Sequence, residues 1–427
     1  MSCRTSPPVS DDNATVARTD AKAQGEWWGG DLPVAQLNEF IERSKQLGWE
    51  PVLDEVAIKR KQFAHRLRNF RVGNWHLLRA LPAESKALDL GCGFGALALG
   101  LSQYFGFVVG VDALWTRVSY GSLRARQDKR NDIRFVEAGG FALPFKGAAF
   151  DLVTMNGVLE WAALYAEGLP RELQVSMLKE VGRTLSDGGT IAVAIENRYA
   201  LETLVGMDDT HTGIRLVPAL PRPLANVVSR ALRRKPYRTY LYDIAGYRQL
   251  FKDAGYREVT ILDLVSSYND YDFVVKPDDQ STYRFLWEKN LVQTFYRRAG
   301  KLRKFLSTRA PTSLGALAYS YLILAGKNVV TLLDGEHPIW KHHLAEGIPA
   351  RAARFACQGA IPGSLAIIAH DGARALGALE LIGAHQSNSR AVLDDSVATS
   401  LQLGTPTNDW SDFNGVRIRG RTAGSES

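Results

Sequence analysis

The chain has 427 residues, and its 52 Lys and Arg against 45 Asp and Glu give a formal net charge of +7. This length suits one large domain with extensions, or two domains, and the hydrophobic fraction of 45% is ordinary for a globular protein. The small positive charge permits an anionic partner without requiring one. The most apolar run, residues 314–333, is interrupted by Gly315, Lys327 and Asn328 and is too short to cross a bilayer.

The cysteines and histidines do not form a disulfide or metal pattern. Cys3, Cys92 and Cys357 lie far apart, so we expect neither a disulfide framework nor a zinc site. The histidines between residues 337 and 343 lack a further ligand at a suitable spacing. We therefore expect no metal and a reducing, cytoplasmic setting.

The beginning of the chain divides into two parts. Residues 1–25 are polar, lack the apolar segment of a signal peptide and are predicted to be a disordered lead. Residues 26–78 are predicted to form a helical cap, because apolar side chains recur there at helical spacing. Residues 54–71 carry many cations, which favours a solvated helix face over contact with an anionic substrate.

A glycine-rich turn organises the centre of the chain. Residues 87–99 begin as an apolar run, turn through three glycines and continue with helix-forming residues. The pattern Gly91-x-Gly93-x-x-Ala96 satisfies the dinucleotide fingerprint, and Asp112 stands where a ribose-binding carboxylate belongs. A dinucleotide is therefore one candidate ligand, and a turn without any ligand is the other simple interpretation.

The residue just before the glycines favours a different cofactor. Asp89 would place a carboxylate near a phosphate that prefers the positive end of the helix to itself. S-Adenosylmethionine has no phosphate but has an α-ammonium group, which suits Asp89. It also has a ribose diol that can donate hydrogen bonds to Asp112.

Five segments in chain order resemble the motifs of class I S-adenosylmethionine-dependent methyltransferases. They are residues 88–95 (LDLGCGFG), 109–112 (VGVD), 142–145 (ALPF), 150–154 (FDLVT) and 185–190 (LSDGGT). The resemblance covers about a hundred residues. It implies a Rossmann-like fold, methyltransferase activity and S-adenosyl-L-methionine as the cofactor.

Three further segments resemble a narrower group. Residues 157–161 (GVLEW), 196–199 (ENRY) and 210–213 (THTG) are similar to bacterial methyltransferases associated with cell-surface glycan synthesis. The usual acid that meets the adenine amino group is missing, since Gly139 stands at that position. Backbone groups would then bind adenine, with Phe141 covering its face. The expected cofactor-binding residues are Asp89, Gly91, Gly93, Gly95, Asp112, Gly140, Phe141 and Asn156.

Apolar strands alternate with amphipathic helices after residue 79, which predicts an α/β fold. We expect a Rossmann-like parallel sheet over residues 79–330, closed by an antiparallel strand at residues 317–325. An insertion at residues 197–242 is expected to cover the cofactor as a substrate lid. Its basic run from Arg230 to Arg238 suits either a solubilising face or contact with phosphate or an anionic membrane. Residues 331–427 are predicted to be a partly disordered tail without an assigned function.

The acceptor is expected to be a hydroxyl group of a small molecule or glycan, which a lipid carrier or peripheral membrane contact would bring to the enzyme. Residues 156–159 read Asn-Gly-Val-Leu, which is unlike the Asn-Pro-Pro-aromatic turn that resembles amino-group methyltransferases. Neither Cys92 nor Cys357 is placed as a nucleophile for methylation of a base carbon. Two other functions remain open, an RNA methyltransferase and a non-catalytic partner with this fold, although an RNA-binding module is not recognisable.

A hydroxyl acceptor needs a group that takes its proton. His211, in the expected lid, is the first candidate, because imidazole titrates near neutral pH and Asp208 and Asp209 would orient it. Glu160, just past the fourth strand of the sheet, is the alternative base.

Overall fold

The structure of the chain is a computed structural model. It describes residues 32–333 except 69, 80, 83, 165, 270, 290, 292–299, 303–304, 307–313, 330 and 332, and then 354–358, 364–370, 375–383, 401–406, 411–413 and 416–423. The expected disordered lead at residues 1–25 lies outside these ranges. Among the described helices, none is long and apolar enough to span a bilayer.

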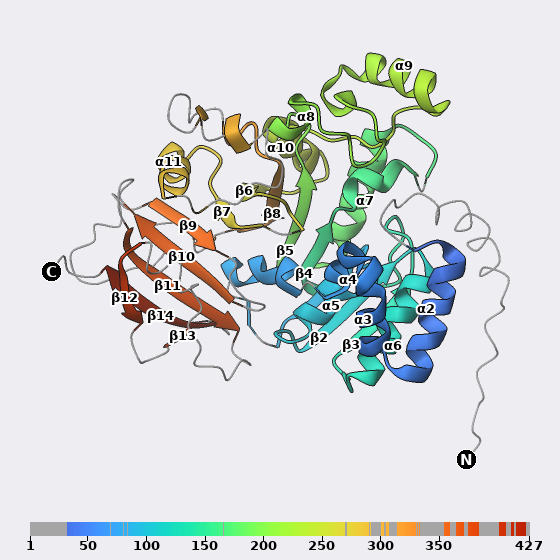
Figure 1. Cartoon of the computed structure of the whole chain (residues 1–427), viewed down its shortest axis with the longest axis horizontal. Helices are drawn as coiled ribbons and strands as arrows, with labels where there is room; N and C mark the ends of the chain where they lie inside the picture. Colours follow the sequence, from blue (N-terminus) through green and yellow to red (C-terminus); the bar gives the residue numbers. More distant parts are fainter. Residues whose placement is uncertain are drawn as a thin grey trace.

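Seven strands form the central part of a large sheet (Figure 1). They are β1 (Lys86–Leu90), β2 (Phe107–Asp112), β3 (Ile133–Glu137), β4 (Phe150–Asn156), β5 (Leu185–Glu196), β6 (Glu258–Val265) and β8 (Ser320–Gly326). Their order is β6-β8-β5-β4-β1-β2-β3. Strands β1 to β5 pair in parallel, whereas β8 is antiparallel to both β5 and β6. The predicted Rossmann-like sheet with an antiparallel strand is confirmed.

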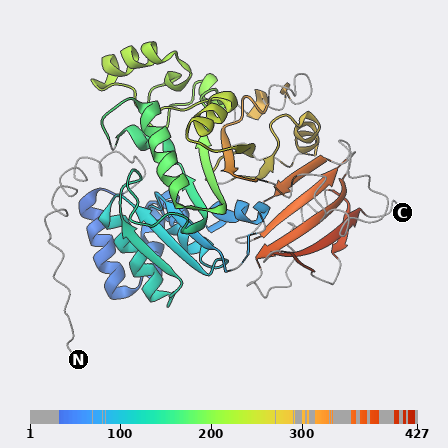
Figure 2. The ribbon, with the colours of Figure 1, turned by 180° about the vertical axis from the view of Figure 1, so that it is seen from behind.

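Helices cover both faces of this parallel region (Figures 1 and 2). One buried core joins Ala87 of β1 to helices α5 (Ala96–Leu101) and α6 (Trp115–Gln127). The other core joins Leu88 of β1 to helices α7 (Pro170–Thr184) and α10 (Ile244–Asp253). Apolar residues on both faces of β1 therefore explain why the strand is sandwiched.

The expected N-terminal helical region consists of α2 (Val34–Leu47), α3 (Trp49–Lys59), α4 (Lys61–Arg68) and the 3-10 helix η2 (Phe70–Arg79). Phe40 and Phe63 are buried with Phe94 and Tyr120. The Phe63 and Phe94 ring centroids are 5.5 Å apart. Since Phe94 belongs to the glycine-rich turn, this helical region packs directly beside the turn.

Asn197 and Tyr242, at the two ends of the expected insertion, pair with each other in an isolated β-bridge. It contains α8 (Leu201–Leu204), the 3-10 helix η4 (Val217–Ala219) and α9 (Arg222–Arg233). Helix α9 lies at the periphery of the molecule in both ribbon views (Figures 1 and 2).

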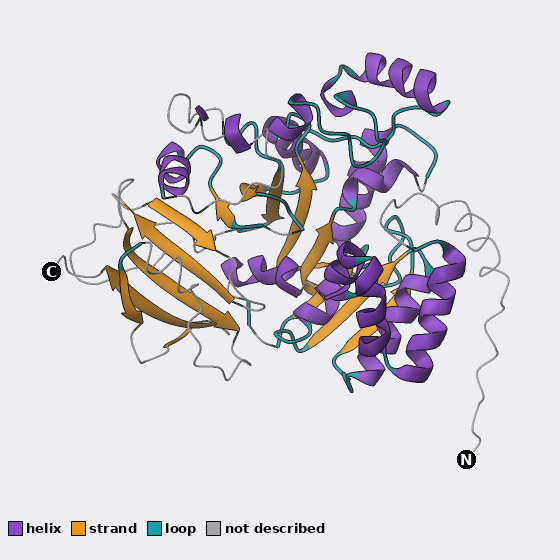
Figure 3. Ribbon diagram, in the orientation of Figure 1, coloured by secondary structure: helices purple, strands orange, loops and turns teal. Residues whose placement is uncertain are grey.

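The C-terminal part, expected to be a partly disordered tail over residues 331–427, contains strands in the segments that the structure describes. Six strands lie there: β9 (Arg354–Gln358), β10 (Ser364–His370), β11 (Ala375–Gly383), β12 (Leu403–Pro406), β13 (Ser411–Phe413) and β14 (Val416–Ala423). They extend the sheet through β7 (Phe273–Val275), which pairs with β9 and β6. Helix α11 (Gln280–Glu288) packs beside them, and strands dominate this end of the molecule (Figure 3).

Candidate functional site

The glycine-rich turn follows β1 directly. Gly91, Gly93 and Gly95 have φ angles of 74°, 54° and 86°. These are left-handed conformations that residues with a Cβ rarely adopt. The Gly91 amide donates to the Val111 carbonyl at 2.7 Å, and the Gly93 amide donates to Oδ2 of Asp112 at 3.0 Å. Asp112 thus holds the turn against the end of β2.

The surroundings of the three glycines differ. A Cβ at Gly91 would lie 2.4 Å from Cγ2 of Val158, and one at Gly95 would lie 2.7 Å from the Phe135 ring. Within the described part of the chain, a Cβ at Gly93 would meet no atom within 4 Å. The backbone at Gly93 therefore borders open space, as a cofactor site requires.

Asp89 lies beneath the turn and is almost completely buried. Its Oδ1 accepts a hydrogen bond from Oγ1 of Thr154 at 2.9 Å, whereas its Oδ2 accepts none from any residue that the structure describes. Burial raises the pKa of Asp89 to about 7, against the opposing effect of the Thr154 hydrogen bond. A cationic group placed at Oδ2 would satisfy this acceptor.

Asp112 ends β2 and is 6% exposed. Its carboxylate also accepts from the Leu114 amide at 3.0 Å and lies 3.7 Å from Nη1 of Arg117. The end of β2 therefore presents an oriented carboxylate beside the glycine turn, in the position predicted for contact with a ribose.

The other predicted cofactor residues lie at the carboxyl ends of neighbouring strands. Gly140 and Phe141 follow β3, where Gly140 approaches the Met177 side chain. Asn156 ends β4, and its buried Oδ1 accepts no hydrogen bond from the described residues. Because β1 to β4 are parallel, all these residues lie at one edge of the sheet. Their individual roles stay predictions.

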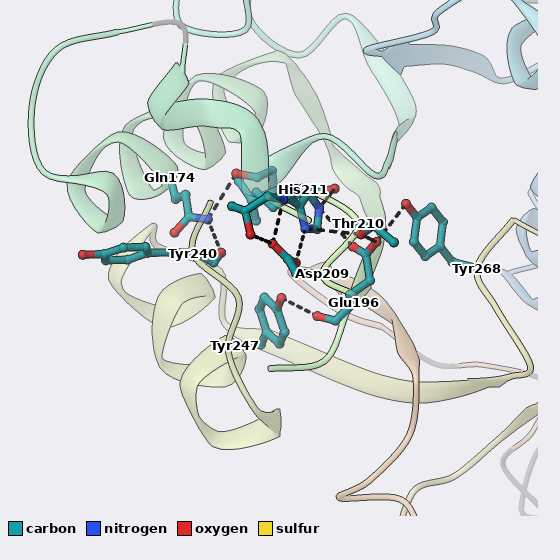
Figure 4. Close-up of polar contacts among 11 residues, drawn as sticks. Gln174, Glu196, Asp209, Thr210, His211, Tyr240, Tyr247 and Tyr268 are labelled. Carbon is teal, nitrogen blue, oxygen red and sulfur yellow. Dashed lines mark hydrogen bonds and ion pairs between the residues drawn. The ribbon is translucent and has the colours of Figure 1, made fainter. Parts of the chain in front are cut away.

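A buried cluster of acids and one histidine lies at the same edge (Figure 4). Nε2 of His211 is 3.6 Å from Oε1 of Glu160 and 3.7 Å from Oε2 of Glu196. Nδ1 of His211 is 3.1 Å from Oδ1 of Asp209. The structure therefore brings together the two predicted proton acceptors, His211 and Glu160, and adds two carboxylates to them.

The members of the cluster come from three separate parts of the chain. Glu160 lies in the 3-10 helix η3 (Leu159–Leu164) after β4, and Glu196 is the last residue of β5. His211 and Asp209 belong to the insertion, so the insertion closes over the ends of β4 and β5. The Trp161 ring packs on His211, with centroids 4.9 Å apart, and helps to exclude water.

Residues around the cluster donate hydrogen bonds to two of its carboxylates. The Tyr268 hydroxyl donates to Oε1 of Glu196 at 3.2 Å, and Oγ1 of Thr210 donates to the same oxygen at 3.4 Å. Oδ2 of Asp209 accepts from the Thr212 amide at 2.8 Å. The carboxylates of Glu196 and Asp209 are thereby oriented before any ligand arrives.

The charges in the cluster influence one another strongly. Burial alone would lower the pKa of His211, but Glu196 and Asp209 outweigh it and raise that pKa well above its usual value. Burial raises the pKa of Glu196 to about 7, although His211 opposes this shift. The ring of His211 therefore carries its proton at neutral pH. This upward shift contradicts the expectation that the imidazole of His211 titrates near neutral pH.

The sequence interpretation missed Glu196 as a site residue and paired His211 with both neighbouring aspartates. Only Asp209 contacts the ring, whereas Asp208 is exposed and binds Arg215 at 2.8 Å. The signal for Glu196 was present, since an acid at the carboxyl end of an apolar strand faces the ligand-binding edge of such a sheet. The Ile191–Ile195 part of β5 is fully apolar and buried.

The strand order, the glycine turn and the carboxylate at the end of β2 define the nucleotide-binding fold of class I methyltransferases. Comparison with known proteins agrees: residues 88–193 match the family described as "Methyltransferase domain". These residues therefore carry the sequence pattern of a methyltransferase domain.

Two of the curated relatives each match a part of the chain. Demethylmenaquinone methyltransferase of Lactococcus lactis subsp. lactis (strain IL1403) is 30% identical over 115 residues, which are 26% of this chain and 42% of that protein. The uncharacterized methyltransferase YcgJ of Bacillus subtilis (strain 168) is 36% identical over 120 residues, or 28% and 43% of the two chains. The chain thus spans less than half the length of the curated relatives that it matches.

Solved structures of methyltransferases also align with the chain. The YcgJ protein of Bacillus subtilis aligns with 61% of this chain and 99% of its own, at 18% identity and a TM-score of 0.34. A phosphoethanolamine N-methyltransferase of Haemonchus contortus, solved with S-adenosyl-L-methionine, aligns with 61% of this chain and 53% of its own, at 14% identity and a TM-score of 0.36.

Proposed function

We propose that the protein is an S-adenosylmethionine-dependent methyltransferase that methylates a hydroxyl group of a small molecule or glycan. The observation that carries the proposal is the buried cluster of Glu160, Glu196, Asp209 and His211 at the ligand-binding edge of the sheet. A hydroxyl is a poor nucleophile until its proton is removed, and this cluster provides groups that take a proton.

The residues around the glycine turn fit the cofactor. The open space at Gly93 admits a ligand close to the backbone, and the unpartnered Oδ2 of Asp89 suits the α-ammonium group. Asp112 would accept hydrogen bonds from the ribose diol. When bound, S-adenosylmethionine supplies a methyl group on a positively charged sulfur, which accepts the electron pair of the breaking carbon–sulfur bond as the acceptor oxygen attacks.

A series of neighbouring residues connects the glycine turn to the acidic cluster. The missing Cβ of Gly91 faces Val158, and a Cβ at Gly157 would lie 2.8 Å from the Tyr268 hydroxyl, which donates to Glu196. An acceptor held between the turn and the cluster would have the cofactor on one side and the acids on the other. Such alignment is the main contribution that the protein makes to an in-line displacement.

Glu160 is the group that we assign as the proton acceptor. His211 is already protonated, whereas both carboxylate oxygens of Glu160 are buried and accept no hydrogen bond from a described residue. The acceptor hydroxyl would give its proton to Glu160, and the charge of His211 would stabilise the developing anion.

The proposal is tested by methyl transfer from labelled cofactor into a panel of glycans, lipid-linked glycans and RNA. We expect the label in a glycan fraction as a methyl ether that resists mild base. Glu160→Gln should lower turnover by about 10²–10⁴-fold, the usual contribution of a general base, while cofactor affinity stays unchanged. Asp208→Asn, at an exposed neighbour of the cluster, is the matched control and should retain full turnover.

The two alternative functions give different results. Label in RNA, with an affinity for RNA that falls steeply with salt, would replace the proposal by an RNA methyltransferase. Failure to bind the cofactor in calorimetry would instead support a non-catalytic partner protein. Full turnover of Glu160→Gln would remove Glu160 as the base.

Helix α9 favours an acceptor carried by a lipid. Leu224, Val227 and Leu232 are 47%, 64% and 66% exposed on this helix, and exposed Arg230 and Arg234 lie beside them. An apolar face bordered by cations is typical of a helix that lies on an anionic membrane. The insertion that supplies His211 would then also bring the site to the membrane surface.

A further inference from the structure

We propose that Glu160, Glu196 and His211 form a binding site for a divalent metal ion. One ligand atom from each residue lies within 4.8 Å of the other two, and all three residues are buried. Nε2 of His211 stands 3.6 Å and 3.7 Å from the nearest oxygens of Glu160 and Glu196. Ligands bound at about 2.1 Å in a tetrahedron are separated by roughly 3.4 Å, so a cation fits between them with little rearrangement.

The carboxylate oxygens between which the cation would lie lack hydrogen-bond donors among the described residues. Oε1 and Oε2 of Glu160 and Oε2 of Glu196 are fully buried, and they accept no hydrogen bond within the described ranges. Burying a carboxylate without partners is costly, and buried charges are normally paired or bound to metals. A cation at the centre would satisfy the acids that one imidazolium, at 3.6 Å and 3.7 Å, satisfies only in part.

The surrounding residues orient the ligands as in known metal sites. Asp209 faces Nδ1 of His211, which directs the other ring nitrogen, Nε2, toward the two glutamates. A carboxylate behind a metal-binding histidine is the usual arrangement, because it fixes the ring and its tautomer. Tyr268 and Thr210 occupy Oε1 of Glu196 and leave Oε2 for the centre.

The set of donors selects the kind of cation. Two carboxylates and one imidazole suit divalent first-row metals such as Mn²⁺, Fe²⁺ and Zn²⁺, whereas Ca²⁺ prefers only oxygen ligands and Cu⁺ prefers sulfur. The cation would displace the proton from Nε2, as metal binding to protonated ligands requires. This proposal departs from the sequence expectation that the protein binds no metal.

The use of the metal in catalysis rests on the proposed function. A cation with an open position would bind the acceptor hydroxyl and lower its pKa, so that the proton leaves to water before the methyl group arrives. With the metal bound, Glu160 would act as a ligand and would not itself take the proton.

The test is metal binding by the full chain after treatment with EDTA and dialysis. Calorimetry with Mn²⁺ and with Zn²⁺ should show one cation per chain, and bound Mn²⁺ should change its electron paramagnetic resonance spectrum. Glu160→Gln and His211→Gln should each weaken binding at least tenfold. Asp209→Asn should weaken it by about 10–100-fold, as loss of a carboxylate behind a ligand does.

Asp208→Asn is the matched control and should bind the cation like the wild type. Cofactor binding measured on every variant shows that it has folded. A wild-type chain that binds the cofactor but neither cation overturns the metal site. If such a chain also transfers methyl in the presence of EDTA, the proposed function stands without the metal. If the chain binds a cation but transfers methyl to no acceptor, the metal site stands and the proposed function is overturned.

Discussion

Asp89 shows how burial changes the pKa of a single side chain. The carboxylate lies under the glycine turn, where burial raises its pKa to about 7 and the nearby Asp112 adds to the shift. An acid that is half protonated at neutral pH is unusual. Its ammonium partner in the proposed complex would favour the ionised form.

This leads to a prediction about pH. Because cofactor binding must expel the proton of Asp89, affinity should rise with pH up to about 7, by as much as tenfold per pH unit on the acid side. Above about pH 8 it should fall again, as the α-ammonium group of the cofactor loses its proton. Calorimetric dissociation constants between pH 5.5 and 9 measure this curve.

Asp89→Asn is the control, since it keeps the shape of the side chain and removes the titration. The variant should bind more weakly and should show no rise below pH 7. A wild-type affinity that stays constant from pH 5.5 to 7.5 would contradict contact between Asp89 and the ammonium group.

Individual residues also show which parts of the site could be predicted from the sequence. The positions of Asp89, the glycines and Asp112 were predictable because a strand, its glycine turn and the end of the next strand each follow a local sequence pattern. The cluster was only partly predictable, since Glu160, Glu196 and His211 are brought together by three elements far apart in the chain. No pattern within any of the three segments encodes their mutual distances or the shifted pKa of His211.

At the scale of elements, the central sheet follows directly from local patterns. Strand β6 and helix α10 lie close to where their apolar residues predict, and the helix begins at Asp243, whose side chain accepts from the Gly246 amide. The C-terminal strands were missed because their sequences are rich in Ala and Gly. Buried on both faces, a strand such as β10 shows no alternation of polar and apolar residues.

The packing of β10 predicts that the C-terminal part folds together with the domain. Ile367 is fully buried and shares one core with Leu77 and Leu78 of η2 and with Leu97 of α5. Ending the chain near Asp334 would expose this core and the edge of β7. We therefore predict that the domain extends past residue 330, where the sequence analysis placed its end.

Ile367→Ala should therefore destabilise the whole molecule. We expect a loss of about 2–5 kcal/mol in the free energy of unfolding, from lost burial and the cavity left behind. Thermal unfolding should remain one transition, and the cofactor should raise its midpoint. Ile58→Ala, at an 84% exposed position, is the matched control and should change little. A separate early transition that the cofactor does not move would show two independent units.

At the scale of the whole molecule, the small net charge of +7 does not identify a partner, whereas the placement of charged and apolar residues on one helix does suggest one. Helix α9 buries Ala225 and Ser229 against the insertion and exposes Leu224, Val227 and Leu232. The helix lies at the periphery of the molecule (Figure 1), and we expect its exposed apolar side chains to reach a flat surface. Membrane contact through α9 and capture of an acceptor near His211 would then be functions of one insertion.

The double variant Val227→Glu with Leu232→Glu tests this arrangement. Two exposed apolar side chains that would insert into the membrane are replaced by charges that anionic lipids repel. Cosedimentation with vesicles of phosphatidylcholine and phosphatidylglycerol should therefore be lost. The wild-type chain should bind these vesicles more weakly as salt is raised, because the cations of α9 are screened.

The matched control is Leu47→Glu with Ile58→Glu, which makes the same charge change at positions 58% and 84% exposed on α2 and α3. The control should bind vesicles like the wild type, and both variants should keep full affinity for the cofactor. Equal cosedimentation of the two double variants would show that α9 is not the membrane-binding element.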